Sequence, residues 1–217
     1  SGEAGLFNAT SAKDCTIDTA VSVAGVQILA GYTGTIACGG GGTTSGLAHH
    51  WKLNDASGQV ADDAVGSADG QLGSSAGTEP DDPAWSTAGK LAGALAFRTA
   101  DGDRVVALDG TDPTAYTIAL WVRPTASTAV SFFCRSDSSG PGSAFSHELR
   151  LNGFTGKFEH YVYSGPSWVA VTGSTVPAPN TWYHVVGVAQ DNGTVRLYVN
   201  GQEEGTAATL SGTLWTG

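Results

Sequence analysis

The sequence lacks several features that point to particular classes of protein. Methionine is absent, even at position 1, so we expect a processed or excised piece of a longer product. No apolar run is long enough to cross a bilayer, which predicts that there is no membrane span. Only 10 Lys and Arg residues oppose 20 Asp and Glu residues, a formal net charge of −10. Because this balance repels a phosphate backbone, nucleic acid is not an expected partner.

Cysteine is also scarce, with three residues and neither a CxxC pair nor zinc-ligand spacing. Cys15 and Cys38 bracket a short β-like segment, and we predict that they form a disulfide worth on the order of 3 kcal/mol. Cys134, in SFFCRSD, is interpreted as a free, buried, small apolar residue rather than a nucleophile. A disulfide and an acidic, Gly-rich composition indicate an extracellular or cell-surface location.

The most informative stretch is NTWYHVVGVAQDNGTVRLYVNG, residues 180–201. Because successive side chains of a strand alternate between faces, its first half presents mostly apolar residues to both sides and is predicted to be a central strand. Asp191, Asn192 and Gly193 predict a tight reversal, since Asn and Gly tolerate positive φ. The returning strand alternates more cleanly, and its predicted inward positions are Val195, Leu197 and Val199.

The first 46 residues are predicted to form a segment separate from the rest of the chain. Residues 1–38 are predicted to be a β-rich N-terminal extension, and the stretch 39–46, GGGGTTSG, a flexible linker. The portion CTIDTAVSVAGVQILAGYTGTI resembles one coil of the parallel β-solenoid repeats of bacterial surface proteins. A disulfide-stapled hairpin is the alternative for this segment.

Short runs bounded by turn residues recur along residues 47–217 without helical periodicity. Before the hairpin, the predicted strands are 48–54, 92–98, 104–108, 117–122, 130–134, 148–151, 157–163 and 169–171. This spacing predicts an all-β fold, an antiparallel sandwich of the jelly-roll type. The ordered motifs GLAHHWKLNDASG, DGQLG, GKLAGALAFRTADGDRVVAL, YTIALWVRP and NTWYHVVGVAQDNGTVRLYVNGQEEG resemble the LamG-like, concanavalin A-like jelly-roll domain over about residues 46–217.

The resemblance implies several functions, because LamG-like domains serve as carbohydrate-binding, adhesive or structural modules of secreted proteins. We predict a non-catalytic adhesion or assembly module of a secreted or cell-surface protein, with a glycan or another protein as its partner. The alternative is a carbohydrate-binding module of a larger glycan-active enzyme, and the third reading is a glycan hydrolase.

Catalytic residues are not evident in the sequence. Enzymes that share this sandwich hydrolyse glycans with paired carboxylates. Glu148 and Glu159 are interpreted as isolated, and the adjacent Glu203 and Glu204 would face opposite sides of a strand. No GxSxG elbow accompanies the five histidines. We therefore predict that the chain is not an enzyme.

Acidic residues gather in the loop after the first predicted strand. A hard cation such as Ca²⁺ needs six to eight oxygen ligands, which carboxylates and carbonyl groups of such a loop supply. The predicted Ca²⁺ ligands are Asn54, Asp55, Asp62, Asp63 and Asp69. A solvated turn without a metal is the alternative.

Aromatic side chains suggest where a glycan would bind, because sugar C–H groups stack on aromatic faces. In KFEHYVYSGPSW, Tyr161 and Tyr163 share one face of a predicted strand, and Trp168 follows in the loop. The predicted ligand-binding residues are Tyr161, Tyr163, Trp168, Arg196 and Tyr198. Ordinary core and surface roles are the alternative.

Family domains usually continue past a segment such as TLWTG into two more strands, so the jelly roll of residues 47–217 is predicted to lack its closing strands. The edge beside residues 48–54 would then accept a strand, from residues 16–36 of this or another copy or from chain beyond residue 217. Strand addition between copies would make a homo-oligomer or fibre.

Overall fold

The computed structural model describes residues 46–110, 113–136, 145–164 and 168–214, and the backbone of four short strands before them. The chain divides into two compact units, Ser1–His50 with Asp63–Ser67, and Trp51–Asp62 with Ala68–Gly217. Within the described residues, no helix is long and apolar enough to cross a membrane.

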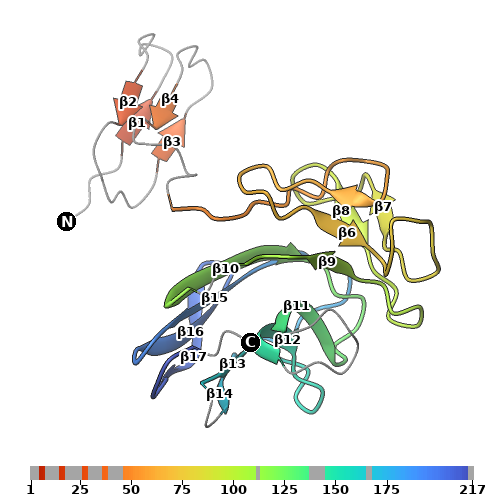
Figure 1. Cartoon of the computed structure of the whole chain (residues 1–217). Helices are drawn as coiled ribbons and strands as arrows, with labels where there is room; N and C mark the ends of the chain where they lie inside the picture. Colours follow the sequence, from red (N-terminus) through yellow and green to blue (C-terminus); the bar gives the residue numbers. More distant parts are fainter. Residues whose placement is uncertain are drawn as a thin grey trace. The chain divides into compact units, whose positions relative to one another are not determined.

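The N-terminal strands pair in parallel. They are β1 (Gly5–Phe7), β2 (Cys15–Ile17), β3 (Val26–Ile28) and β4 (Ile36–Cys38). Gly5 pairs with Val26 and Cys15 with Ile36, so β1–β3 and β2–β4 share one offset of 21 residues. A constant offset between parallel strands is the pattern of stacked coils, whereas a hairpin is antiparallel. The hairpin alternative is therefore wrong for this backbone (Figure 1).

The predicted disulfide remains a prediction, because the side chains of Cys15 and Cys38 lie outside the described residues. The backbone register pairs Cys15 with Ile36 and Cys38 with Ile17. The two cysteines therefore lie on neighbouring strands but not opposite one another.

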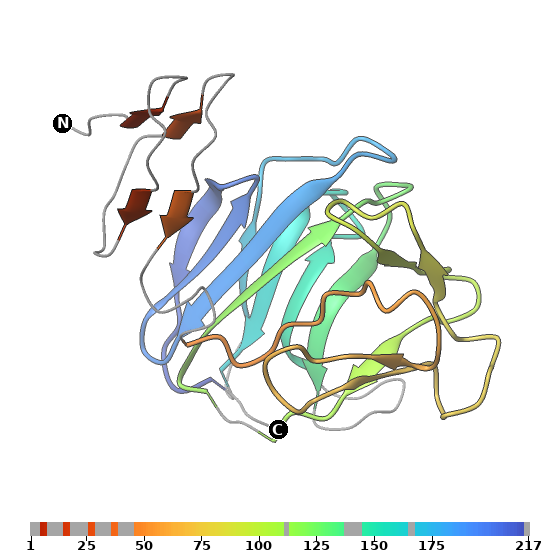
Figure 2. The same cartoon turned by 90° about the horizontal axis from the view of Figure 1, so that it is seen from above.

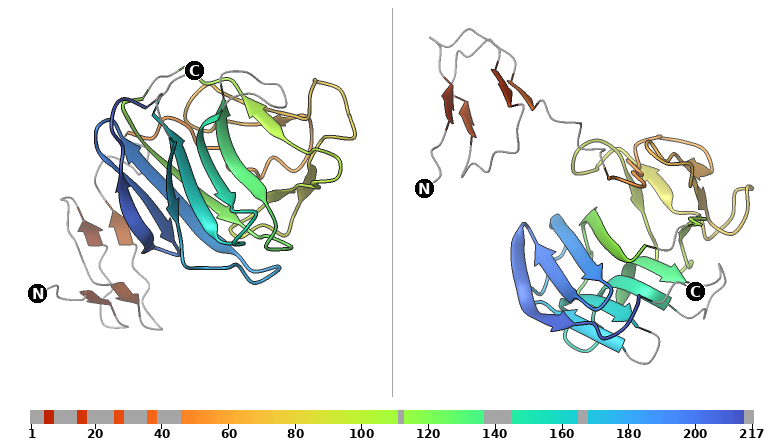
Figure 3. Two further views of the ribbon diagram at one scale, coloured as in Figure 1. Left: turned by 90° about the horizontal axis from the view of Figure 1, so that it is seen from below. Right: turned by 60° about the vertical axis from the view of Figure 1, so that its left-hand side comes forward.

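Two four-stranded antiparallel sheets form the larger unit. The first has the order β10 (Ala115–Val122), β15 (Tyr183–Gln190), β16 (Thr194–Val199) and β17 (Gln202–Thr209). The second has the order β11 (Val130–Ser136), β12 (Phe145–Leu151), β13 (Phe158–Tyr163) and β14 (Trp168–Thr172). Figures 2 and 3 show the strands of the two sheets lying in two layers. The predicted all-β jelly-roll sandwich is thus confirmed.

The core lies between these two sheets. Its buried side chains come from strands of both sheets and from the segment after β17: Val122, Leu149, Leu151, Phe158, Val162, Val171, Val185, Ala189, Val195, Leu197, Val199, Leu210 and Leu214. The inward positions predicted for the returning hairpin strand are confirmed, with exposures of 0–3%. Strand β15 lies between β10 and β16, which confirms that it is central. Asn192 has a φ of 46°, as the predicted turn requires.

Two small sheets precede the sandwich. The first contains β5 (Val60–Ala61), β6 (Gly70–Leu72) and β9 (Val105–Ala107), and the second contains β7 (Ala84–Ser86) and β8 (Ala94–Ala96). Strands β8 and β9 lie within the predicted runs 92–98 and 104–108. Strands β5, β6 and β7 were not predicted; they are short and lie between Gly- and Asp-rich turns.

The predicted strand 48–54 is wrong. Leu53 has a φ of 54° and Ala56 a φ of 69°, and such left-handed backbone interrupts an extended strand. In this segment only Trp51 takes part in a β-bridge. The prediction of strand addition beside residues 48–54 therefore loses the edge on which it depended, and oligomer formation stays a prediction.

Candidate functional site

The outward face of the β11–β14 sheet carries a row of polar and aromatic side chains. Because β12 and β13 alternate, Leu149 and Leu151 enter the core while Glu148 and Arg150 point away from it. On β13, the residues that point away are Glu159, Tyr161 and Tyr163, and Trp168 begins β14. The register pairs Arg150 with Glu159, Glu148 with Tyr161, and Tyr163 with Trp168.

Arg150 joins two carboxylates on this face. Its Nη1 donates to Glu148 Oε2 at 2.9 Å, and its Nη2 lies 2.6 Å from Glu159 Oε2. Glu148 and Glu159 are only 5% and 4% exposed. The interpretation of these glutamates as isolated is therefore wrong, because the β12–β13 register brings residues eleven positions apart onto one guanidinium.

Glu159 is held in its ionised form. Burial alone would raise its pKa, but hydrogen bonds from Thr172, Arg150 and Asn152 together outweigh burial and lower the pKa. The Thr172 hydroxyl donates to Glu159 Oε1 at 2.6 Å and the Asn152 amide donates at 3.1 Å. A carboxylate with this many donors is a poor proton donor, so it is unsuited to act as a general acid.

Arg150 also begins an aromatic stack. Its guanidinium carbon lies 4.1 Å from the ring centroid of Tyr161. The Tyr161 ring stacks on Trp168 with centroids 4.5 Å apart and an interplanar angle of 9°, and Tyr163 lies 4.7 Å from Trp168. Trp168 is 42% exposed. The stack therefore presents the indole to solvent, while Tyr161 and Tyr163 fix its orientation.

A cavity of about 640 Å³ adjoins the stack. It shares Arg150 and Glu148 with the carboxylate cluster, and Ser131, Asn152 and Phe154 also line it. The Phe154 side chain is fully exposed. Exposed aromatic rings next to hydrogen-bonding groups are the usual components of a sugar site.

The predicted ligand-binding residues are divided between the two sheets. Tyr161, Tyr163 and Trp168 lie together, as described above. Arg196 and Tyr198 lie on β16 of the other sheet, and they point away from the core because Val195, Leu197 and Val199 enter it. Arg196 pairs with Glu203 at 2.7 Å. The structure therefore does not bring these two residues to the Trp168 face.

Sequence reasoning missed Arg150, Asn152 and Phe154. The alternation in FSHELRL was a signal that Glu148 and Arg150 share a face. Phe154 lies in the turn between β12 and β13, where Asn152 Oδ1 accepts hydrogen bonds from the Phe154 and Thr155 amides at 2.9 and 3.0 Å. The motif NGFTG predicts such a turn but not its neighbours.

Cys134 is a free thiol, as predicted, but it is exposed rather than buried. A β-bulge between Ser131 and Phe133 shifts the alternation of β11, so Cys134 pairs with Glu148 and shares its outward face. Partial desolvation of the sulfur and the Glu148 carboxylate raise the pKa of the thiol, which keeps it protonated.

Asp63, one of the predicted Ca²⁺ ligands, is hydrogen-bonded within its own loop. Asp63 Oδ1 accepts hydrogen bonds from the His50, Val65 and Gly66 amides at 2.9, 3.2 and 3.0 Å, and Asp63 Oδ2 lies 2.6 Å from His49 Nδ1. Burial alone would raise the pKa of Asp63, but these hydrogen bonds lower it strongly. The Asp63 carboxylate therefore stabilises the conformation of its own loop.

Two of the other predicted Ca²⁺ ligands, Asp55 and Asp62, contact each other, and a third, Asn54, lines a cavity. Asp55 Oδ2 accepts a weak hydrogen bond of 3.4 Å from the Asp62 amide, and Asn54 lines a separate cavity of about 400 Å³ with Trp85. Among the described His, Cys, Asp and Glu residues, the one group of three with metal-ligand spacing contains Glu79, Asp81 and Asp82 instead. Ca²⁺ binding by the predicted loop stays a prediction.

Comparisons with known proteins agree with this architecture. Residues 98–217 match the concanavalin A-like lectin/glucanases superfamily, and because the match spans more than half of the chain, the protein belongs to that superfamily. Domain 4 of AbnA, an extracellular GH43 arabinanase from Geobacillus stearothermophilus solved in complex with arabinotriose, has a similar fold, with a TM-score of 0.56, 23% identity and 78% of each chain covered. No curated protein matches the sequence. The family resemblance drawn from the sequence is confirmed.

Proposed function

We propose that this chain is a non-catalytic carbohydrate-binding module of an extracellular glycan-active enzyme. The observation that carries this proposal is the stack of Arg150, Tyr161 and Trp168, which presents a half-exposed indole at one end and, at Arg150, lines a cavity at the other. Trp168 would stack on one sugar ring of an oligosaccharide, and Asn152 with Ser131, which line the cavity, would contact hydroxyl groups of another ring. This proposal takes up the alternative of the sequence analysis, which the comparisons favour over adhesion.

The charges at the site favour a neutral glycan. Two carboxylates, Glu148 and Glu159, surround one guanidinium, so the cluster keeps a net negative charge. An anionic uronate would be repelled, and Arg150 is already engaged by both glutamates. The arabinotriose bound by domain 4 of AbnA is a neutral oligosaccharide, which supports the same choice for this chain.

The same cluster supports a role without catalysis. Glycoside hydrolysis requires one protonated carboxylic acid and a second carboxylate at a set distance. Here Arg150 pairs with both glutamates, and the pKa of Glu159 is lowered rather than raised. Neither residue has the surroundings of a proton donor.

Glycan screening tests the proposal directly. We expect the full chain to bind neutral oligosaccharides, with arabino-, xylo- and gluco-oligosaccharides as probes, and to discriminate against oligogalacturonate of matched length. Chromatography of the same mixtures after prolonged incubation is expected to show no shortened products. Absence of binding to every neutral probe, or release of shorter sugars, would overturn the proposal.

Adhesion or assembly, the first prediction from the sequence, remains a second candidate. The observation that favours it is the parallel pairing of β1–β3 and β2–β4 at one offset, since stacked coils of this kind extend by adding neighbours. Light scattering measures particle mass. A mass that increases with the concentration of the full chain, together with no glycan binding, would favour this candidate.

A further inference from the structure

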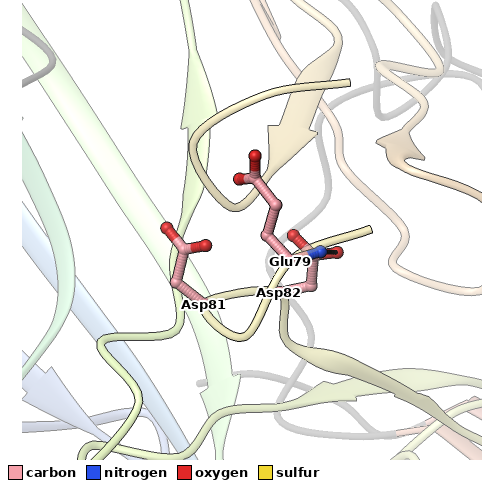
Figure 4. A group of neighbouring side chains, drawn as sticks. All are labelled: Glu79, Asp81 and Asp82. Carbon is pink, nitrogen blue, oxygen red and sulfur yellow. Dashed lines mark hydrogen bonds between the residues drawn. The ribbon is translucent and has the colours of Figure 1, made fainter. Parts of the chain in front are cut away.

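Three carboxylates meet in the segment between β6 and β7, outside the site already described. Glu79, Asp81 and Asp82 each offer one oxygen, and these oxygens lie within 4.8 Å of one another. Figure 4 shows the three side chains around the loop that follows β6. The Asp82 amide donates to the Glu79 carbonyl at 3.2 Å and the Glu79 amide donates to Asp82 Oδ2 at 2.8 Å, which ties the two residues together.

Asp82 supplies an independent sign of a ligand. The residue is only 9% exposed, and its Oδ1 is buried without a hydrogen-bond partner among the described residues. A buried carboxylate oxygen is costly unless a donor or a cation satisfies it. Oδ2 is already engaged by the Glu79 amide, so the unsatisfied atom is the one free to take a ligand.

Asp82 Oδ1 packs against the backbone of Gly73. A side-chain carbon at Gly73 would collide with Asp82 Oδ1 and would lie 3.3 Å from Asp81 Oδ1. The absence of a side chain at Gly73 therefore lets oxygens from two aspartates lie close together against this segment. Gly73 also has a φ of 65°, which disfavours any residue with a Cβ there.

The surrounding charges favour a doubly charged cation. Arg104 Nη2 lies 2.9 Å from Asp81 Oδ2 and offsets one of the three negative charges. Glu79 is oriented by hydrogen bonds from the Ser74 and Ser75 hydroxyl groups, which carry no charge. A net charge of about −2 therefore remains at the cluster, which one divalent cation would neutralise.

We propose that Glu79, Asp81 and Asp82 form a binding site for Ca²⁺, with Asp82 Oδ1 as its buried ligand. The donors are all oxygens, which suits a hard cation. Their irregular arrangement suits Ca²⁺, which accepts flexible geometry, better than Mg²⁺, which demands an octahedron. The site is distinct from the loop predicted from the sequence, and it does not depend on the proposed glycan function.

Calorimetric titration of the EDTA-treated full chain with CaCl₂ tests this site. We expect one Ca²⁺ per chain, with weaker binding of Mg²⁺. The Asp82→Asn variant keeps the shape of the side chain but loses its charge, and we expect its affinity to fall by at least the roughly 10-fold to 100-fold seen when metal-site residues are altered. Two matched controls are expected to bind as the unmodified chain does: Asp55→Asn, in the loop predicted from the sequence, and Asp101→Asn, whose exposed carboxylate pairs with Arg98.

Three results would overturn the proposal: no Ca²⁺ binding by the unmodified chain, unchanged affinity in Asp82→Asn, or an equal loss in either control. If circular dichroism shows that Asp82→Asn does not fold, Glu79→Gln serves in its place, since Glu79 lies nearer the surface. Retained Ca²⁺ affinity in a folded Glu79→Gln chain would also contradict the site.

Discussion

His160 is a polar residue placed in the middle of the apolar core, with 0% exposure. Its Nδ1 lies 3.0 Å from the Arg196 carbonyl oxygen, which can only accept, so Nδ1 carries the proton. Its Nε2 then accepts from the Tyr116 hydroxyl at 2.9 Å. His147, which is 3% exposed, packs against Tyr116, with the two ring centroids 4.4 Å apart. Both imidazoles are therefore built into the fold in the neutral form.

Burial lowers the pKa of His160 to about 4, and burial together with Arg135 and His160 lowers the pKa of His147 to about 3. Both values lie below the unfolded value of about 6.5, so the unfolded state binds more protons between these limits. The stability that these histidines provide is present above about pH 6.5 and is lost as pH falls toward 4. We expect urea unfolding to show a loss of up to about 1.4 kcal/mol per pH unit for each histidine below pH 6.5.

The variant His160→Gln separates this effect from the titration of carboxylates. Its free energy of unfolding is expected to be lower at pH 7.5 but to change less between pH 7 and pH 5, where Asp and Glu residues remain ionised. The same slope in the variant and in the unmodified chain would contradict the role of His160.

At the level of single residues, the sequence predicted that Tyr161 and Tyr163 share a face but not that Glu148 and Glu159 meet at Arg150. Tyr161 and Tyr163 are two positions apart, so alternation alone places them on one face. Glu148 and Glu159 are distant in sequence, and only the pairing of Arg150 with Glu159 brings them together. The periodicity of side chains within a strand does not show which strands are neighbours, so it could not predict this cluster.

Strand β15 is central in its own sheet and packs directly against the other sheet. It lies between β10 and β16. Its Gly187 faces the opposite layer, and a Cβ added to this glycine would lie 2.9 Å from Leu149 Cδ2 and 3.0 Å from His160 Cε1. These contacts are closer than ordinary van der Waals separation. The glycine therefore sets how closely the two sheets approach at this point.

Substitution of this glycine tests the packing. We expect Gly187→Ala to lower the free energy of unfolding by about 1–3 kcal/mol, because overpacking forces neighbouring side chains to shift. Gly110→Ala is a matched control, since an added Cβ there meets nothing within 4 Å, and its expected change is within about 0.5 kcal/mol. Denaturant unfolding measures both, and equal stabilities of the two variants would contradict this picture of the core.

Strands in which apolar and polar residues alternate strictly were predictable from the sequence. Segments whose conformation depends on a residue with positive φ were not. Residues 194–199 alternate without exception between core and outward positions, and the inward positions of this strand were predicted from the sequence. Residues 48–54 contain Trp51 and Leu53 at strand-like spacing, but the left-handed φ of Leu53 ends any extended run. A leucine rarely adopts the left-handed conformation, so the sequence does not predict it at this position.

At the scale of the whole molecule, the sandwich gives two outward faces with different chemistry. The β11–β14 face carries the stack that ends in Trp168, while Tyr198 and the Arg196–Glu203 pair lie on the face of β16. The sequence grouped these residues into one site because it does not reveal which sheet a strand joins. The fold was easier to predict than the site, since the fold follows from patterns within strands and the site from contacts between them.

Calorimetric titration with the tightest-binding neutral oligosaccharide of the screen, applied to Trp168→Ala and Tyr198→Ala, is the most direct test of the proposed binding face. We expect Trp168→Ala to weaken binding by about tenfold or more, since an aromatic contact contributes up to about 1.5 kcal/mol beyond its buried area. Tyr198→Ala, which removes a tyrosine from the other face, is expected to bind as the unmodified chain does. Unchanged binding by a folded Trp168→Ala chain, or loss of binding in Tyr198→Ala, would contradict the assignment of the β11–β14 face.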